Sequence, residues 1–172
     1  MNILLIGFMG SGKSTVANRL SHSLGWPLLE MDDLVYRKTG TCDMHEVFAQ
    51  GGELLLRRTE IAIAEEFAEK KNWVVSAGGG VVLNKIVLDY FKQAGAQVIF
   101  LRAKFDTIAK RLKGDASRPL FDLENARKIY DFRLPLYAAY ADAAIDVDGR
   151  TVEEIAAQIL GLVQKKRAAN GF

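Results

Sequence analysis

The stretch Gly7-Phe-Met-Gly-Ser-Gly-Lys13-Ser14 satisfies G-x-x-x-x-G-K-[ST], the pattern of a phosphate-binding loop. It follows the short apolar run Asn2–Ile6 and precedes the amphipathic segment Ser14–Leu24. Glycines in such a loop let consecutive backbone N–H groups point at a phosphate chain, and the following helix adds the positive end of its dipole. We therefore predict that the chain binds a nucleoside triphosphate, in preference to reading this stretch as an ordinary turn before a helix.

Two side chains of this loop carry specific chemistry. Lys13 is expected to reach the β- and γ-phosphate oxygens, and the Ser14 hydroxyl is expected to ligate Mg²⁺. The predicted nucleotide-binding residues of the loop are Gly10, Ser11, Gly12, Lys13, Ser14 and Thr15.

Length and charge restrict the class of protein. The 172 residues fit one domain with a substantial core. The chain has 23 basic and 21 acidic residues, a net charge of +2, so no strong field favours nucleic acid or membrane surfaces. Cys42 is the single cysteine, which excludes a disulfide framework within the chain and suits a reducing compartment. With no basic leader and no apolar stretch of membrane-spanning length, we expect a cytosolic protein. We also expect a monomer.

Apolar strand-like runs alternate with helical periods along the chain. This alternation predicts an α/β fold with a mainly parallel sheet, in which ligands bind beyond the carboxyl ends of the strands. The expected strands are Asn2–Ile6, Leu28–Met31, Trp73–Ser76, Gln97–Leu101 and Ala144–Val147. The expected helices are Ser14–Leu24, Asp33–Lys38, Glu53–Lys70, Lys85–Gln93, Lys104–Lys113, Leu123–Tyr140 and Val152–Lys166, the last one opened by a capping box at Thr151–Glu154.

Carboxylates gather after the second expected strand, in Glu30-Met-Asp32-Asp33. Because side chains alternate along an extended segment, Glu30 and Asp32 are expected to face the same cleft. A carboxylate there could accept a hydroxyl proton or hold waters on Mg²⁺, and we assign this function to Asp32. Asp33 is expected to cap the next helix.

Glycines and arginines supply the remaining candidates. Gly78-Gly79-Gly80 follows the third expected strand and would let a small ligand approach the backbone; a simple tight turn is the alternative. Arg57 interrupts an apolar helical pattern, Arg118 lies in a loop-like segment between two helices, and Arg133 stands beside Pro135 in a helical period. Arginine forks bind carboxylates and phosphates, so several of them around one cleft predict an anionic acceptor or a phosphate clamp.

The class of nucleotide-binding protein follows partly by elimination. The guanine-binding Asn-Lys-x-Asp pattern is missing, because Asn84-Lys85 is followed by Ile86-Val87. The remaining features fit phosphoryl transfer to a small metabolite that carries a hydroxyl and a carboxylate. A kinase of gluconate or of a nucleoside monophosphate, and a binding protein without catalysis, stay open at this point.

Several motifs together resemble the shikimate kinase family, over about residues 2 to 148. They are Gly7–Thr15, Glu30-x-Asp32, Phe48-Ala-x-x-Gly-Glu53, Arg57-Arg58-Thr-Glu60, Gly78-Gly-Gly80, Arg118-Pro-Leu and Arg133-x-Pro-Leu-Tyr137. The resemblance implies a three-layer fold like that of nucleoside monophosphate kinases, with a five-stranded parallel sheet and helices on both faces. It also implies ATP, Mg²⁺ and phosphorylation of the 3-hydroxyl of shikimate by a single domain of residues 1–172.

The resemblance also implies roles for individual residues. Asp32 would bind the acceptor hydroxyls as the candidate base, within an acceptor-binding region of residues 30–60. The shikimate carboxylate would lie between Arg57 and Arg133, backed by Gly79 and Gly80. Arg118 would contact phosphates from a mobile lid of residues 114–122, and Arg111 would pack on adenine.

Two positions depart from the family pattern. Glu30 stands where the family usually has aspartate, and we expect it to reach a magnesium-bound water through its extra methylene. Leu56 stands where an aromatic residue commonly precedes the arginine pair, so it would change the lining of the acceptor pocket.

Overall fold

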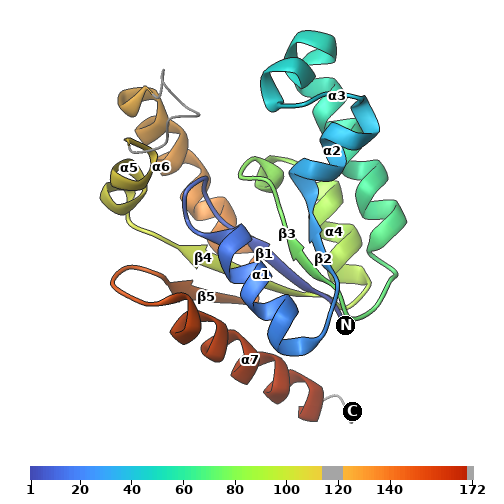
Figure 1. Ribbon diagram of the computed structural model, residues 1–172, viewed down its shortest axis with the longest axis vertical. Helices are drawn as coiled ribbons and strands as arrows, with labels where there is room; N and C mark the ends of the chain where they lie inside the picture. Colours follow the sequence, from blue (N-terminus) through green and yellow to red (C-terminus); the bar gives the residue numbers. More distant parts are fainter. Residues whose placement is uncertain (114–121, 170–172) are drawn as a thin grey trace.

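A five-stranded parallel sheet forms the centre of the molecule (Figure 1). The computed structural model describes residues 1–113 and 122–169. The strand order is β2-β3-β1-β4-β5, and helices cover both faces, which confirms the predicted fold class. The strands are β1 (Ile3–Ile6), β2 (Leu28–Glu30), β3 (Val74–Ser76), β4 (Gln97–Arg102) and β5 (Ala143–Asp146).

The helices divide between the two faces of the sheet. Helices α1 and α7 pack against each other on one face, whereas α3, α4 and α6 lie on the other (Figure 1). This division follows from right-handed crossovers, because the chain moves from β1 to the edge strand β2 and then back across the sheet. In the part of the chain that the structure describes, no helix is long and apolar enough to cross a membrane. The helices are α1 (Lys13–Leu24), α2 (Met31–Thr39), α3 (Met44–Phe67), the short 3₁₀ helix η1 (Val81–Leu83), α4 (Lys85–Gln93), α5 (Phe105–Lys113), α6 (Leu123–Tyr140) and α7 (Val152–Ala169).

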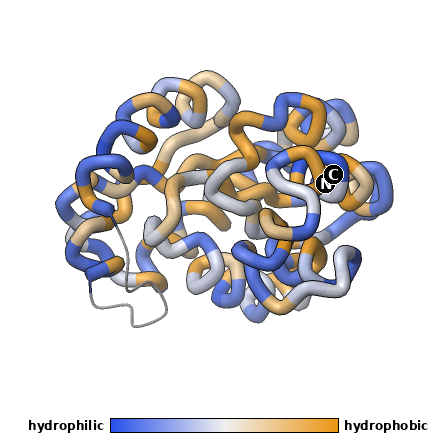
Figure 2. Tube along the Cα trace, turned by 90° about the horizontal axis from the view of Figure 1, so that it is seen from above, coloured by the Kyte–Doolittle hydropathy of each residue, from blue (hydrophilic) through white to orange (hydrophobic). Residues whose placement is uncertain are grey.

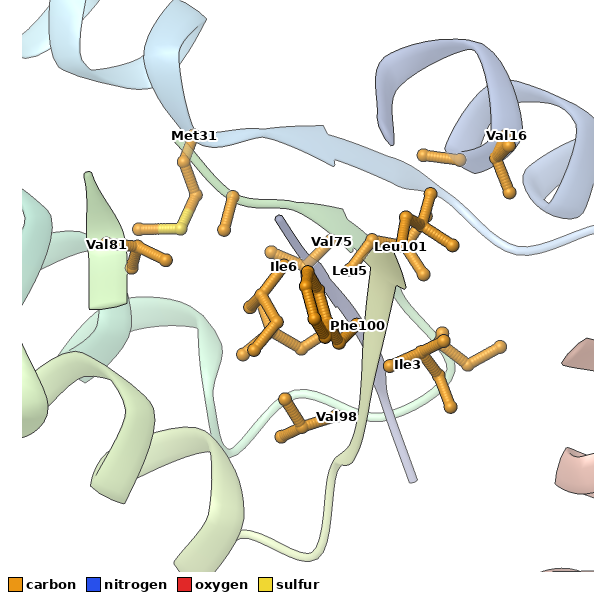
Figure 3. Close-up of a cluster of buried hydrophobic side chains, with 14 of the residues drawn as sticks. Ile3, Leu5, Ile6, Val16, Met31, Val75, Val81, Val98, Phe100 and Leu101 are labelled. Carbon is orange, nitrogen blue, oxygen red and sulfur yellow. The ribbon is translucent and has the colours of Figure 1, made fainter. Parts of the chain in front are cut away.

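The core is built on the central strands. Every residue of β1 is fully buried, because a central parallel strand is covered on both faces and therefore needs a continuous apolar sequence. Leu4 pairs with Val75 of β3 on one side and with Val98 of β4 on the other. Figure 3 shows side chains of these strands meeting around Phe100, and Figure 2 shows outer helices in which hydrophilic and hydrophobic stretches alternate.

Helix boundaries near β2 differ from the expectation. Helix α2 begins at Met31, so Asp32 lies in its first turn and does not share an extended segment with Glu30. That expectation was wrong, as was the expectation that Asp33 caps the helix, because Glu30 holds the cap position. Carboxylates in a first turn interact favourably with the helix dipole, which is the physical reason for this placement.

Helix α3 is longer than the sequence pattern indicated. It starts at Met44 and is bent at Gly52, whose φ of 63° and ψ of −158° are not helical. Asp43 caps it by accepting a hydrogen bond of 2.9 Å from the Glu46 N–H. The glycine pair at 51–52 made the first part of this helix look like a loop. The predicted capping box of α7 is confirmed, since Thr151 and Glu154 exchange hydrogen bonds of 2.8 and 3.2 Å.

Candidate active site

The phosphate-binding loop lies between the carboxyl end of β1 and the first turn of α1. Gly7 has a φ of 149°, and a Cβ there would lie 2.7 Å from the Leu101 carbonyl oxygen, so no other residue fits. The Lys13 ammonium donates hydrogen bonds to the carbonyl oxygens of Gly7 (2.9 Å) and Phe8 (3.1 Å). Lys13 therefore lies across the loop, where it can meet phosphate oxygens.

A cavity of about 320 Å³ continues from this loop toward α7. Arg111 of α5 borders it and donates a 2.8 Å hydrogen bond to the Gly10 carbonyl oxygen. Arg150, which follows β5, lies on the cavity wall with Val147. An apolar wall beside a planar guanidinium suits a flat nucleobase. Arg111 was predicted to lie here, whereas Arg150 was not.

Oxygen ligands meet at the start of α1. Ser14 Oγ donates to Glu30 Oε2 at 3.2 Å and lies 3.5 Å from Ser76 Oγ. Burial raises the pKa of the Glu30 carboxyl, and hydrogen bonds from Ser76 and Ser14 oppose that effect. Among residues 1–113 and 122–169, no three His, Cys, Asp or Glu side chains form a group that could hold a metal ion. A hydroxyl with one carboxylate fits Mg²⁺, which usually takes few protein ligands and completes its shell with water and phosphate oxygens.

The three glycines after β3 bring the two halves of the site together. A Cβ at Gly78 would lie 2.5 Å from Asp32 Oδ1, and one at Gly79 would lie 3.2 Å from the Met9 nitrogen of the phosphate loop. A Cβ at Gly80 would lie 3.0 Å from an Arg57 guanidinium nitrogen. The glycine segment thus lies against Asp32, the phosphate loop and the Arg57 guanidinium in succession.

Arg57 is held by two carboxylates of its own helix. It donates to Glu53 Oε1 at 2.9 Å and to both Glu60 oxygens at 3.1 and 2.9 Å. Burial alone would lower the pKa of the Arg57 guanidinium, but Glu60 and Glu53 outweigh it and raise the pKa. Burial raises the pKa of the Glu60 carboxyl, opposed by Asn84 and Arg57. The result is a permanently charged guanidinium fixed at the glycine segment.

Arg133 reaches the same segment from α6. Its Nη1 donates to the Gly79 carbonyl oxygen at 3.3 Å, and the Tyr137 hydroxyl donates to the same oxygen. Arg133 Nε is buried without a hydrogen-bond partner among the described residues. An unpaired buried donor on a cation is costly, so the arrangement favours an anionic ligand.

The structure brings most of the predicted site residues to one edge of the sheet. Lys13, Ser14, Glu30, Asp32, Arg57, Gly79, Gly80, Arg111 and Arg133 all lie at the carboxyl ends of the strands or in the segments that follow them. Arg118 and residues 114–121 of the predicted lid lie outside the described residues.

Four contributing residues received no role from the sequence. Ser76 closes β3 and Arg150 follows β5, so the rule that ligands bind beyond carboxyl ends could have found both. Glu60 lies one helical turn after Arg57, a spacing typical of an ion pair, whereas Asn84 offers no such signal, because only the packing of α3 against the segment before α4 brings it to Glu60.

Comparisons with known proteins agree with this geometry. The family model described as shikimate kinase matches residues 9–164. A shikimate kinase of Thermodesulfovibrio yellowstonii is 37% identical over 175 residues, which cover 99% of this chain and 98% of that protein. One of Streptococcus gordonii is 38% identical, covering 91% of this chain and 96% of its own length. The solved structure of a shikimate kinase from Acinetobacter baumannii in complex with shikimate has a TM-score of 0.86 and 30% identity, covering 96% of this chain and 94% of that one.

Proposed function

The chain belongs to the shikimate kinase family and phosphorylates shikimate with ATP, and we propose the following roles for its residues in this reaction. The acceptor is the 3-hydroxyl, which attacks the γ-phosphorus of ATP while ADP leaves. The hydroxyl proton goes to the Asp32 carboxylate. One domain, residues 1–172, carries the whole reaction, with residues 30–60 as the acceptor-binding region.

On the nucleotide side, the phosphates lie along the loop from Gly10 to Thr15. Lys13 stabilises the charge that develops on the transferred group, which is where most of the rate acceleration should arise. Arg111 and Arg150 hold the base in the cavity beside α7. When Mg²⁺ is bound beside Ser14 and Glu30, it neutralises phosphate charge, with Glu30 acting through a water. We keep the assignment of Arg118 to the phosphates as a prediction.

On the acceptor side, two cations bind the shikimate carboxylate. Arg57 lies against Gly80, and Arg133 lies against Gly79 with a buried unpaired N–H, so both can contribute to one anion site. With its carboxylate held at this anion site and a hydroxyl held by Asp32, the shikimate ring is oriented so that the reacting hydroxyl faces the phosphate loop. We also propose that the protein is a cytosolic monomer. Size-exclusion chromatography tests the monomeric state.

The observation that carries this proposal is the glycine segment, which contacts Asp32, the phosphate loop and Arg57 at three successive positions. A coupled assay of ADP release from MgATP, with shikimate, gluconate or CMP as acceptor, tests the proposed function. Turnover that depends on shikimate supports the assigned roles. ATP binding with turnover only on gluconate or CMP would contradict the acceptor site, and would point to Glu30 and Leu56 as the positions responsible.

A further inference from the structure

Asn84 connects the acceptor-binding arginine to the segment that carries the glycines. Its Nδ2 donates to Glu60 Oε2 at 3.0 Å and to the Arg57 carbonyl oxygen at 3.0 Å. Both partners are acceptors, so the amide nitrogen, and not the amide oxygen, must face them. One side chain therefore holds both the main chain of Arg57 and the carboxylate that fixes its guanidinium.

The position of Asn84 makes this use of its side chain unusual. It occupies the cap position of α4, where asparagine commonly accepts a hydrogen bond from the first turn. Here its side chain forms no cap hydrogen bond, and the residue is 6% exposed. The amide is turned away from its own helix and into the interface with α3.

The backbone between the glycines and Asn84 is short and internally bonded. Val81 N–H donates to the Gly78 carbonyl oxygen at 3.1 Å, Leu83 N–H to Gly80 at 3.0 Å, and Asn84 N–H to Val81 at 2.8 Å. Because η1 is this compact, the bonds from Asn84 to α3 also set how Gly80 lies against the Arg57 guanidinium. The contact at Gly80 is close, with 3.0 Å between a Cβ placed there and the guanidinium.

We propose that Asn84 is a positioning residue for the acceptor carboxylate, acting through Glu60 on Arg57. This inference rests on the proposed function, since it assumes that Arg57 binds the shikimate carboxylate. Glu60 is 3% exposed, so each donor to its carboxylate matters. The groups that act on Glu60 are Arg57 of its own helix, Asn84 before α4 and the negative charge of Asp32 on α2.

Removal of the amide should weaken shikimate binding selectively. Without Asn84, Glu60 keeps Arg57 as its donor among the described residues, but the pair loses the bonds that tie it to the segment before α4, so the guanidinium is less closely held against Gly80. We expect Asn84→Ala to raise KM for shikimate about tenfold, a typical effect of losing one hydrogen bond to a charged group. The kcat and KM for ATP should stay within about twofold, because the described hydrogen bonds of the Asn84 amide go to α3, away from the phosphate loop.

Asn2→Ala provides a matched control. Asn2 is a buried asparagine whose amide bonds Ala68 and Lys70 at the opposite end of the sheet, so its loss should lower thermal stability without raising KM for shikimate. Asn84→Ser is the second variant. Serine is favoured at a helix cap position, so this variant should fold even if Asn84→Ala does not. Serine is too short to bridge to Glu60, so the same rise in KM is expected.

A double-mutant cycle with Glu60→Gln tests whether Asn84 acts through Glu60. If it does, Asn84→Ser raises KM for shikimate by less than about twofold in the Glu60→Gln background. An unchanged KM in both Asn84 single variants, a parallel rise in KM for ATP, or full additivity with Glu60→Gln would overturn the inference while leaving the proposed function intact. Absence of shikimate-dependent turnover in the wild-type protein would overturn both.

Discussion

Asp32 and Gly78 lie so close that a single methyl group at residue 78 would touch the carboxylate, at 2.5 Å from Oδ1. Because residue 78 has no side chain, the Asp32 carboxylate has room beside the glycine segment, where the acceptor hydroxyl is proposed to bind. Asp32→Asn keeps the shape but removes the base, so kcat should fall about a hundredfold or more. Affinity for MgATP, measured by nucleotide titration, should change less than about twofold. Equal losses in nucleotide affinity and turnover would argue that Asp32 serves the nucleotide side.

Lys13 is 8% exposed and donates to two carbonyl oxygens of its own loop. It is therefore a preorganised cation at the place where the transferred group carries charge. Lys13→Ala should lower kcat on the order of a hundredfold, as expected for loss of a preorganised charge donor. Steady-state ADP release measures this, with Lys128→Ala as control, because that lysine is exposed and pairs with Glu124 of its own helix. A near-normal rate for Lys13→Ala would mean that the loop does not bind the transferred phosphate.

At the scale of elements, the glycine segment after β3 is sensitive to added volume. Gly78→Ala places a Cβ against Asp32 Oδ1, so we expect kcat to fall by about tenfold or more as the carboxylate is displaced. The expected loss lies in shikimate-dependent turnover, with the affinity for MgATP largely retained.

Gly161→Ala in α7 is the control for this substitution. A Cβ at Gly161 meets nothing within 4 Å, and alanine favours a helix by about 1 kcal/mol, so stability should rise and activity should stay the same. If Gly78→Ala were as active as Gly161→Ala, Asp32 could move without consequence and its proposed role as base would lose its support.

Most elements could be predicted from the chain because their signals are local. The apolar run Ile3–Ile6 has the composition of a strand buried on both faces, and Thr151 and Glu154 form a capping box within one turn. The first half of α3 was missed because Gly52 interrupts its pattern, although Asp43 was an available cap signal. Asp32 was placed on the wrong element, since short patterns do not separate the end of a strand from the start of a helix, although it does lie beside the glycine segment.

The site was predictable to the extent that its residues end strands or lie just beyond them. Lys13, Glu30 and Gly79 do so, and the carboxyl-end rule brings them together. The network of Glu60 with Asn84 joins residues 24 positions apart across two packed helices. No local pattern encodes that pairing, so only the tertiary structure reveals that Asn84 bonds the carboxylate beside Arg57, although the spacing of Arg57 from Glu53 and Glu60 within α3 is itself a local signal.

For the molecule as a whole, Tyr137 links the core to the active site. Its ring stacks on Phe100 of β4 with centroids 5.2 Å apart, and its hydroxyl donates to the Gly79 carbonyl oxygen. The residue is 1% exposed, and burial, opposed by Arg133, raises the pKa of Tyr137 to about 12. The free energy of unfolding therefore depends on whether the Tyr137 hydroxyl keeps its proton.

The sign of this dependence follows from proton binding. Above pH 10 the unfolded chain releases the Tyr137 proton while the folded chain keeps it, so the free energy of unfolding falls as the pH rises. Between pH 10 and pH 12 this residue should remove about 2 kcal/mol, since one pKa unit corresponds to about 1.4 kcal/mol. Tyr137→Phe lacks the titrating group, so denaturant unfolding from pH 8 to 12 should show its curve falling less steeply than that of the wild type. Parallel curves for the two proteins would mean that Tyr137 ionises alike in both states, and that its hydroxyl is not held in the core.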